Sequence, residues 1–163
     1  MPMNHQQISE WCLAGGVSPF EPNNVNPASL DLRWSGRLKF DSVTGTGWSS
    51  NFDATYVSLL RGEIYLLDTL EYIKMPLDHC GLILSKTKLG RGGTELGHVG
   101  WVDPGFEGTI TFQLIHFSRT MRTIEPNERL VQLVLLKLNE ATAISYAEVG
   151  NYNGQHKPTG TRV

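Results

Sequence analysis

The amino-acid sequence predicts a single, mostly-β domain, a barrel or jelly roll with one small helix near its N-terminus. Glycine and proline are frequent, with 17 and 8 copies in 163 residues, and short apolar runs alternate with turn-rich segments. The length suits one domain with a sizeable core. We find neither an internal repeat nor a linker, so residues 1–163 are expected to form one unit.

The helix and the strands follow from the spacing of apolar residues along the chain. Asn4 is expected to cap a helix that runs to about Ala14, because the apolar residues between them recur at helical spacing. Residues 17–34, rich in Pro and Asn, are expected to form an extended loop that leads into a strand. Strands are expected over residues 38–40, as two runs within 63–75, and over 81–85, 109–117 and 130–138.

The 109–117 segment is the clearest strand, because apolar and polar residues alternate along it. Its apolar residues fall on one face, and Thr111 and Gln113 fall on the other. The 130–138 segment is almost continuously apolar and is therefore expected to be buried on both faces.

Composition and charge exclude several classes of partner. The formal net charge is -2 and no long basic run occurs, so duplex nucleic acid is not an expected partner. The longest apolar stretch, 130–138, is interrupted by Gln132 and Lys137 and is too short to span a bilayer. No signal peptide is recognisable, so a cytoplasmic location away from membranes is expected. Cys12 and Cys80 are too few for a disulfide framework and are expected to be reduced.

The segment WVDPGFEG, Trp101–Gly108, is expected to form a tight hairpin turn, since Pro104 fixes φ and the glycines tolerate unusual backbone angles. The spacing of Asp103 and Phe106 also suits a sugar site. An aromatic ring packs on a deoxyribose and leaves no room for a 2′-hydroxyl. The carboxylate accepts a hydrogen bond from the 3′-hydroxyl or holds a water.

A glycine-rich stretch with clustered cations, KTKLGRGG, follows the 81–85 strand. Such stretches are commonly solvated loops. This one also suits a phosphate site, in which Thr87 supplies a hydroxyl, Arg91 a bidentate fork and the backbone its N–H groups. The spacing is not that of a Walker A loop. The HxE…PCxxC signature of zinc deaminases is also absent.

Six segments, in this order, resemble the motifs of the dCTP deaminase and trimeric dUTPase superfamily, and are most similar to those of dCTP deaminases. They cover nearly the whole chain. The segments are NPASLDLRW (26–34), EYIKMP (71–76), SKTKLGR (85–91), GWVDPGFEGTITFQL (100–114), ERLVQLVL (128–135) and NGQHKPTGTR (153–162).

The resemblance implies a homotrimer of distorted, dUTPase-like jelly rolls with active sites between subunits. It further implies a pyrimidine deoxynucleoside triphosphate bound with Mg²⁺ and without zinc, and residues 150–163 acting as a mobile C-terminal lid. The residues that it places at the nucleotide are Lys86, Thr87, Lys88, Arg91, His98, Val99, Asp103, Phe106, Gln113, Gln132, Tyr152, Gln155, Lys157 and Arg162, with Thr87, Arg91, Asp103 and Gln113 at catalytic positions.

A departure from the family pattern at Gln113 leaves the reaction open. In dCTP deaminases a glutamate at this position shuttles protons, whereas a neutral amide is neither a general acid nor a general base. Glu95 and Glu107 are nearby in sequence, but nothing fixes the geometry of such loop carboxylates. His98 is a further candidate for moving the proton, because the resemblance places it beside the base. Overall similarity favours deamination of dCTP to dUTP and ammonia. The alternatives are a dUTP diphosphatase giving dUMP and diphosphate, which requires only Asp103, and a homologue that binds nucleotide without catalysis.

Overall fold

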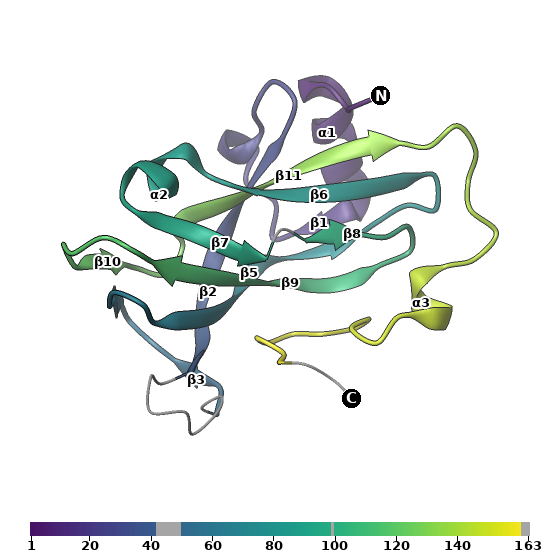
Figure 1. Cartoon of the computed structure of the whole chain (residues 1–163). Coiled ribbons are helices and arrows are strands. Elements are labelled where there is room, and N and C mark those ends of the chain that lie inside the picture. The colour runs from purple at the N-terminus through teal and green to yellow at the C-terminus, as the bar shows by residue number, and fades with distance from the viewer. Residues whose placement is uncertain (42–49, 99, 161–163) are drawn as a thin grey trace.

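The computed structural model describes residues 1–41, 50–98 and 100–160, and shows a strongly curled β-sheet with short helices outside it (Figure 1). The side chains of Asp41 and His98 are not described. The elements are α1 (His5–Trp11), a π-helical turn (Cys12–Gly16), β1 (Val17–Ser18), a 3₁₀ turn (Pro22–Asn24), β2 (Leu30–Asp41), β3 (Phe52–Asp53), β4 (Val57–Leu59), β5 (Ile64–Lys74), β6 (His79–Ser85), α2 (Thr87–Arg91), β7 (Thr94–His98), β8 (Trp101–Val102), β9 (Glu107–His116), β10 (Arg122–Ile124), β11 (Arg129–Lys137) and α3 (Tyr146–Val149).

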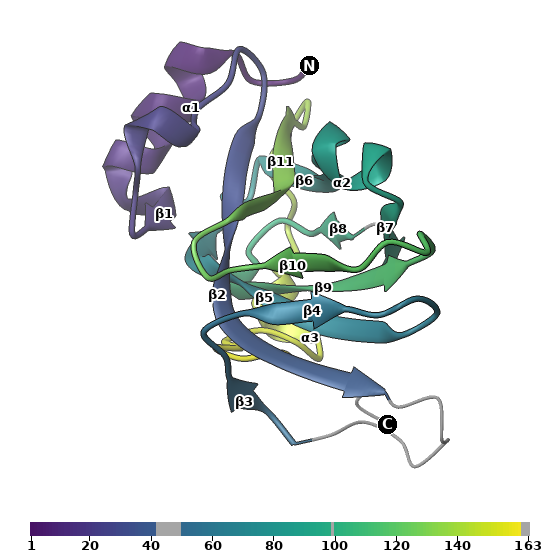
Figure 2. The same cartoon turned by 90° about the vertical axis from the view of Figure 1, so that its left-hand side faces the viewer.

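The sheet accounts for the architecture. Its main path runs β7-β9-β5-β2-β11-β6-β8, with β1 paired to β5 and β3 paired to β2, and a separate pair joins β4 to β10. The two views show the path bending round, so that β6 and β8 lie across from β9 and β5 (Figure 1, Figure 2). Apolar side chains from most of these strands form one core inside the curl. The prediction of a mostly-β, barrel-like fold is confirmed.

The N-terminal helix forms as its sequence predicts. The Asn4 side chain accepts a hydrogen bond from the Gln7 backbone N–H at 3.0 Å, and the Gln7 side chain accepts one from the Asn4 N–H at 3.0 Å. This reciprocal cap satisfies two N–H groups that would otherwise lack partners. Ile8 anchors the helix in the core. The chain then continues as a π-helical turn through Gly15, whose φ of 92° favours glycine.

Strand β9 positions much of the cavity wall. As predicted, Phe112 and Leu114 are buried, while Thr111 and Gln113 on the opposite face are half-buried. Gln113 stands in register between Leu66 on β5 and His98 on β7. Strand β11 differs from its prediction, because its residues alternate between buried and half-buried and only one of its faces is fully covered.

Strand β2 begins eight residues earlier than predicted, within the segment expected to be a loop. Four of its apolar residues are buried, namely Leu30, Leu32, Trp34 and Leu38. Two of its arginines pair with carboxylates of β5. Arg33 Nε lies 2.6 Å from Glu71 Oε1, and Arg37 Nη2 lies 2.6 Å from Asp68 Oδ2. The sequence alone does not indicate a strand here, because the carboxylates that pair with these two arginines are remote in sequence. The two runs expected within 63–75 are also one strand, β5, with irregular registers at residues 68–72 against β9.

The turn that contains Asp103 is tight, but it is not a hairpin. The Phe106 N–H donates to the Asp103 carbonyl at 3.2 Å, and Gly105 has a φ of 78°. Strand β8 before the turn pairs with β6, whereas β9 after it pairs with β5 and β7. The turn therefore carries the chain from one end of the curled sheet across to the other side.

The cationic stretch after β6 is helical rather than a loop. Thr87–Arg91 forms the single turn α2, which Leu89 anchors with a fully buried side chain. The packing of that one leucine outweighs the low helix propensity of the neighbouring glycines.

None of the helices in the described part of the chain is both long and apolar enough to cross a membrane.

Candidate functional site

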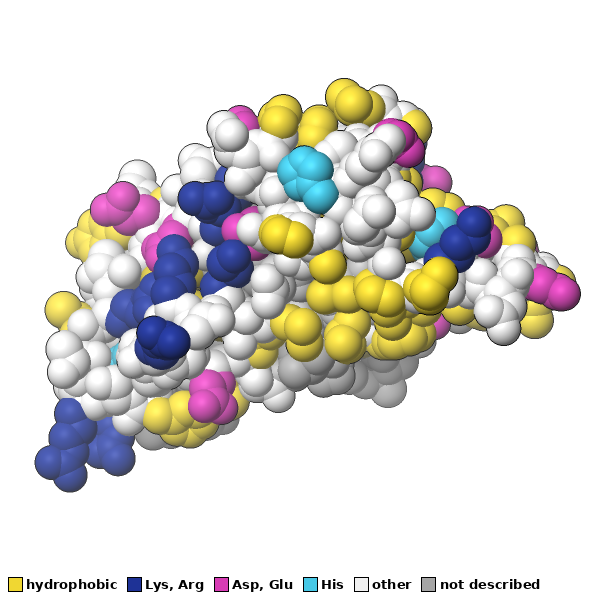
Figure 3. Space-filling model, turned by 90° about the horizontal axis from the view of Figure 1, so that it is seen from above, with side chains coloured by type: hydrophobic (Ala, Val, Ile, Leu, Met, Phe, Trp, Pro, Cys, Tyr) yellow, Lys and Arg dark blue, Asp and Glu magenta, His cyan; other side chains and the backbone are white. Residues whose placement is uncertain are grey.

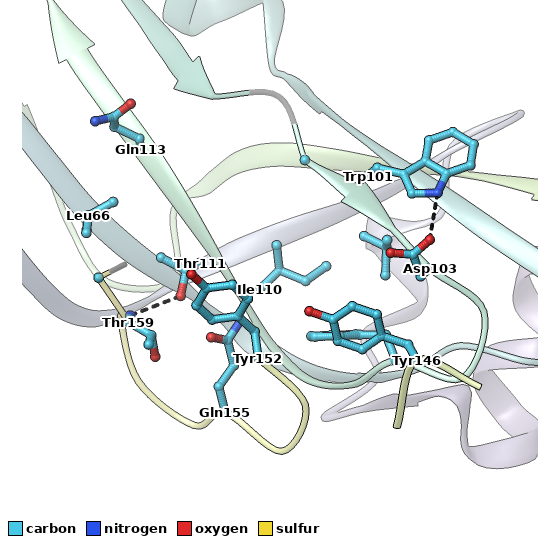
Figure 4. Close-up of a pocket in the computed structure, with 14 residues that line it drawn as sticks. Leu66, Trp101, Asp103, Ile110, Thr111, Gln113, Tyr146, Tyr152, Gln155 and Thr159 are labelled. Atoms are coloured by element: carbon cyan, nitrogen blue, oxygen red, sulfur yellow. Dashed lines mark hydrogen bonds between the residues drawn. The ribbon is translucent and has the colours of Figure 1, made fainter. Parts of the chain in front are cut away.

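A cavity of about 420 Å³ lies between β9, the turn at residues 103–106, α3 and the C-terminal segment (Figure 4). Five of the predicted site residues line it, namely Asp103, Phe106, Gln113, Tyr152 and Gln155. They come from elements as far apart in sequence as β9 and the tail, which the fold brings together.

Asp103 stands at one end of the cavity. The indole Nε1–H of Trp101 donates to its Oδ1 at 3.1 Å. The negative charge of Asp103 adds to burial in raising the pKa of the nearby Cys80 thiol. Among the described residues that line the cavity, Asp103 is the only one with a carboxylate.

The wall beside Asp103 is aromatic. The rings of Phe106 and Tyr146 meet at a centroid distance of 5.7 Å with 58° between their planes. Helix α3 is held here because the Tyr146 N–H donates to the Pro104 carbonyl at 2.9 Å. Gly105 must be glycine, since its φ is positive and a Cβ would collide with Ser145 Oγ. This wall suits a flat, weakly polar group such as a sugar ring.

Gln113 lines the opposite end of the cavity, next to Leu66 (Figure 4). Its amide makes no hydrogen bond with any residue in the described part of the chain. The amide lies close to the backbone of Gly97, where a Cβ would collide with it. A neutral amide presents an adjacent donor and acceptor, which suits the edge of a base.

The C-terminal segment docks along the first half of β9. The Thr109 N–H donates to the Gln155 carbonyl at 2.9 Å, and Gln155 Nε2 donates to the Thr109 carbonyl at 2.7 Å. Farther along, the Thr159 N–H donates to Thr111 Oγ1 at 3.2 Å, which closes the cavity on that side (Figure 4). Outside the cavity, His156 stacks on Tyr72 with 5.0 Å between ring centroids.

A buried polar network supports this docking. Asp68, with no exposed surface, accepts hydrogen bonds from Ser35 Oγ, from Arg37 Nη2 at 2.6 Å and from Thr109 Oγ1 at 3.2 Å. Thr109 Oγ1 also lies 3.3 Å from the Gln155 carbonyl. Burial raises the pKa of the Asp68 carboxyl above its ordinary value, although these hydrogen bonds oppose the shift.

The cationic residues predicted to hold phosphates lie elsewhere. Helix α2 and α3 stand at opposite ends of the molecule (Figure 1), and neither Lys86 nor any residue of α2 lines the cavity. Lys86 Nζ pairs with Asp31 at 2.7 Å and Lys88 Nζ with Glu128 at 2.8 Å. Seen from above, Lys and Arg side chains gather on the side where α2 lies (Figure 3).

The remaining predicted residues either lie away from the cavity or fall outside the described part of the chain. Gln132 Oε1 accepts a hydrogen bond from Ser29 Oγ at 3.3 Å, in keeping with a structural role. Lys157 is exposed on the tail. Val99, Arg162 and the His98 side chain lie outside the described residues. Glu95 and Glu107, the two carboxylates considered as alternative proton carriers, are exposed and do not line the cavity.

The side chains that line the cavity include one group that could contact a magnesium ion, the Asp103 carboxylate. The described residues contain no cluster of three or more His, Cys, Asp or Glu side chains that could bind a metal. Mg²⁺ prefers oxygen ligands and usually keeps waters while it binds substrate phosphates. Asp103 fits such an arrangement as one oxygen-bearing partner.

Two aromatic residues of the cavity wall are not among the site residues predicted from the sequence, Trp101 and Tyr146. Trp101 belongs to the same sequence motif as Asp103 and stands two residues before it, so the sequence alone could have indicated it as a site residue. Tyr146 gave none, because only the folded chain brings α3 to the turn.

The comparisons with known proteins agree with this architecture. The model of the family described as dCTP deaminase-like matches residues 3–138. The dCTP deaminase, dUMP-forming, of Rhodococcus erythropolis is 33% identical over 91% of this chain and 87% of its own length. That of Aquifex aeolicus is 31% identical, over 90% of this chain and 85% of its own.

Solved structures show the same fold. The 2′-deoxycytidine 5′-triphosphate deaminase of Agrobacterium tumefaciens superposes with a TM-score of 0.71 at 16% identity, covering 82% of this chain and 46% of that one. A mutant dUTPase of the Staphylococcus aureus phage phi11, described with a structural Mg(II) ion, gives a TM-score of 0.50 at 16% identity, covering 77% and 86%. The chain therefore belongs to the dCTP deaminase-like family of enzymes.

Proposed function

We propose that this protein hydrolyses dUTP to dUMP and diphosphate. The observation that carries the proposal is the pairing of Asp103 at one end of the cavity with the neutral Gln113 at the other. Hydrolysis of the phosphoanhydride bond of dUTP needs a positioned water and charge neutralisation, which a single carboxylate and cations supply. Deamination needs a proton shuttle at the base, and an amide is not one. The dUMP-forming relatives support the product.

In the proposed reaction, Asp103 both positions the attacking water and accepts its proton. Asp103 holds a water that attacks the α-phosphorus, and it accepts the proton that the water loses. The bond from the α-phosphorus to the bridging oxygen breaks, and diphosphate leaves with the electron pair. Mg²⁺ on the phosphates would neutralise part of their charge. The sugar packs on Phe106 and Tyr146, and the base reaches Gln113.

A second subunit completes the site in this proposal. No Lys or Arg is among the described residues that line the cavity, yet a nucleoside triphosphate carries several negative charges. Thr87, Lys88 and Arg91 are exposed on α2, far from their own cavity. A symmetric trimer that brings α2 of one copy to the cavity of the next would supply these groups. Lys157 and Arg162 of the tail would add to them.

Deamination of dCTP is the second candidate, and the names of the relatives favour it. It requires a group other than Gln113 to move the proton to and from the base. Of the described carboxylates only Asp103 lines the cavity, at the end away from Gln113 (Figure 4). The geometry therefore supports hydrolysis of dUTP better.

Product analysis separates the two reactions. The protein is incubated with Mg²⁺ and either dUTP or dCTP, and products are resolved by ion-exchange chromatography. We expect dUMP from dUTP and no change in dCTP. Gln113→Glu restores a carboxylate at the base end and should add dCTP consumption. Gln6→Glu, the same change on the exposed side of α1, should add none.

The other outcomes are equally informative. Consumption of dCTP by the unaltered protein would favour the deaminase, with a proton carrier other than Gln113. Absence of turnover with both nucleotides, together with binding of labelled dUTP, would favour a protein that binds nucleotide without catalysis.

A further inference from the structure

Trp101 is an exposed aromatic residue whose one polar atom is already engaged. Its side chain lines the cavity and remains 55% exposed, although its indole Nε1–H donates to Asp103 Oδ1 at 3.1 Å. The ring is therefore not part of the buried core.

The hydrogen bond constrains Asp103 without neutralising it. An indole N–H is a donor only and carries no charge, unlike Lys, Arg or protonated His. It therefore fixes the carboxylate orientation and leaves the negative charge in place. It engages one oxygen, and the other lies on the side of Ile110 and Tyr146 (Figure 4).

The geometry points to Trp101 as a positioning residue for Asp103. With Oδ1 held by the indole, the second oxygen is presented to the cavity in one orientation, where it receives the proton of the attacking water. This role rests on the proposed hydrolysis of dUTP. A water held by a freely rotating carboxylate would spend less time in line with the α-phosphorus, because orientation contributes directly to rate.

The test compares Trp101→Phe, which keeps an aromatic ring and removes the donor, with Trp11→Phe, the same change on α1 away from the cavity. For Trp101→Phe we expect kcat with dUTP to fall about 10-fold, as for loss of one hydrogen bond to a charged group. The Kd for a non-hydrolysable imido analogue of dUTP and the Tm should stay within error. Trp11→Phe should leave kcat unchanged.

A second readout does not depend on turnover. The indole N–H resonance of Trp101 is assigned by its loss from the NMR spectrum of Trp101→Phe, and it should shift upfield in Asp103→Ala, which removes the acceptor. An unchanged resonance would show that the hydrogen bond is not formed and would overturn the inference, whatever reaction the protein performs. Unchanged kcat in Trp101→Phe, or a weaker Kd alone, would also overturn it. Absence of dUTP hydrolysis by the unaltered protein, with the NMR shift present, would refute only the proposed reaction.

Discussion

At the scale of single residues, the base end of the cavity depends on a glycine. A methyl group on Gly97 would collide with Gln113 Oε1 and lie 2.8 Å from Ile115 Cδ1. The amide is the movable partner, so Gly97→Ala should displace it and raise the KM for dUTP about 10-fold with little change in Tm. Gly100→Ala is the matched control, because it also adds a methyl group, in this case to a residue of the cavity wall. That methyl would meet Ile83 Cγ1 at 3.7 Å, an ordinary contact, and would not displace Gln113. Equal KM values for the two variants would show that Gln113 does not contact the base.

The sequence predicts which residues belong to the site, but it does not predict which of them lie together in one copy of the chain. Asp103, Phe106 and Gln113 line one cavity, as their motif indicates, because a single turn and strand carry all three. Thr87 and Arg91 belong to the same predicted nucleotide site but lie at the other end of the chain's own fold (Figure 1). A linear motif gives the type and order of side chains, and it does not say which copy of the chain contributes them.

At the scale of elements, β5 carries Asp68, the buried carboxyl whose hydrogen bond with Thr109 supports the docking of the C-terminal segment. Because burial raises the folded-state pKa of Asp68 above its ordinary value of 3.8, the folded protein keeps this proton to higher pH than the unfolded chain does. The contribution of Asp68 to the free energy of unfolding is thus fully present below the unfolded pKa. It is lost as pH rises through the folded pKa.

Replacement of Asp68 should remove this pH dependence. We expect the Tm of Asp68→Asn to increase relative to that of the unaltered protein as pH rises above 3.8, the ordinary pKa of the carboxyl. Replacement of Asp78 is a control for which the pH dependence of Tm should be opposite, because the hydrogen bond with His79 lowers the pKa of the Asp78 carboxyl. Thermal unfolding followed by circular dichroism measures both series. A Tm difference between Asp68→Asn and the unaltered protein that stays constant with pH would contradict the raised pKa.

The strands themselves could be predicted only where their patterns were local. Strand β9 alternates along its own sequence and was predicted closely, whereas β2 contains charges that pair with Glu71 and Asp68 on β5. Those ion pairs join β2 to β5, and neither pair is visible in the local sequence of β2. The 103–106 turn was predicted as a hairpin for the same reason, since the pairing of β8 with β6 is invisible from the turn.

At the scale of the whole molecule, the proposed site is made from two copies of the chain. The cavity would supply the carboxylate and the wall for the sugar, and α2 of a neighbouring copy would supply the cations, because α2 lies at the opposite end of its own fold (Figure 1). Two variants, each disabled in a different half of the site, should therefore restore activity when they assemble together.

Co-expression of Asp103→Asn and Arg91→Ala with different affinity tags, followed by tandem purification, is the most direct measurement. Each variant alone should release little dUMP from dUTP. Every trimer that contains both variants has one site of its three in which an intact Asp103 meets an intact Arg91 of the neighbouring copy, so about a third of the activity should return. Mixed trimers as inactive as the parents would contradict a shared site, and an Asp103→Asn homotrimer with full activity would contradict the central role of that carboxylate.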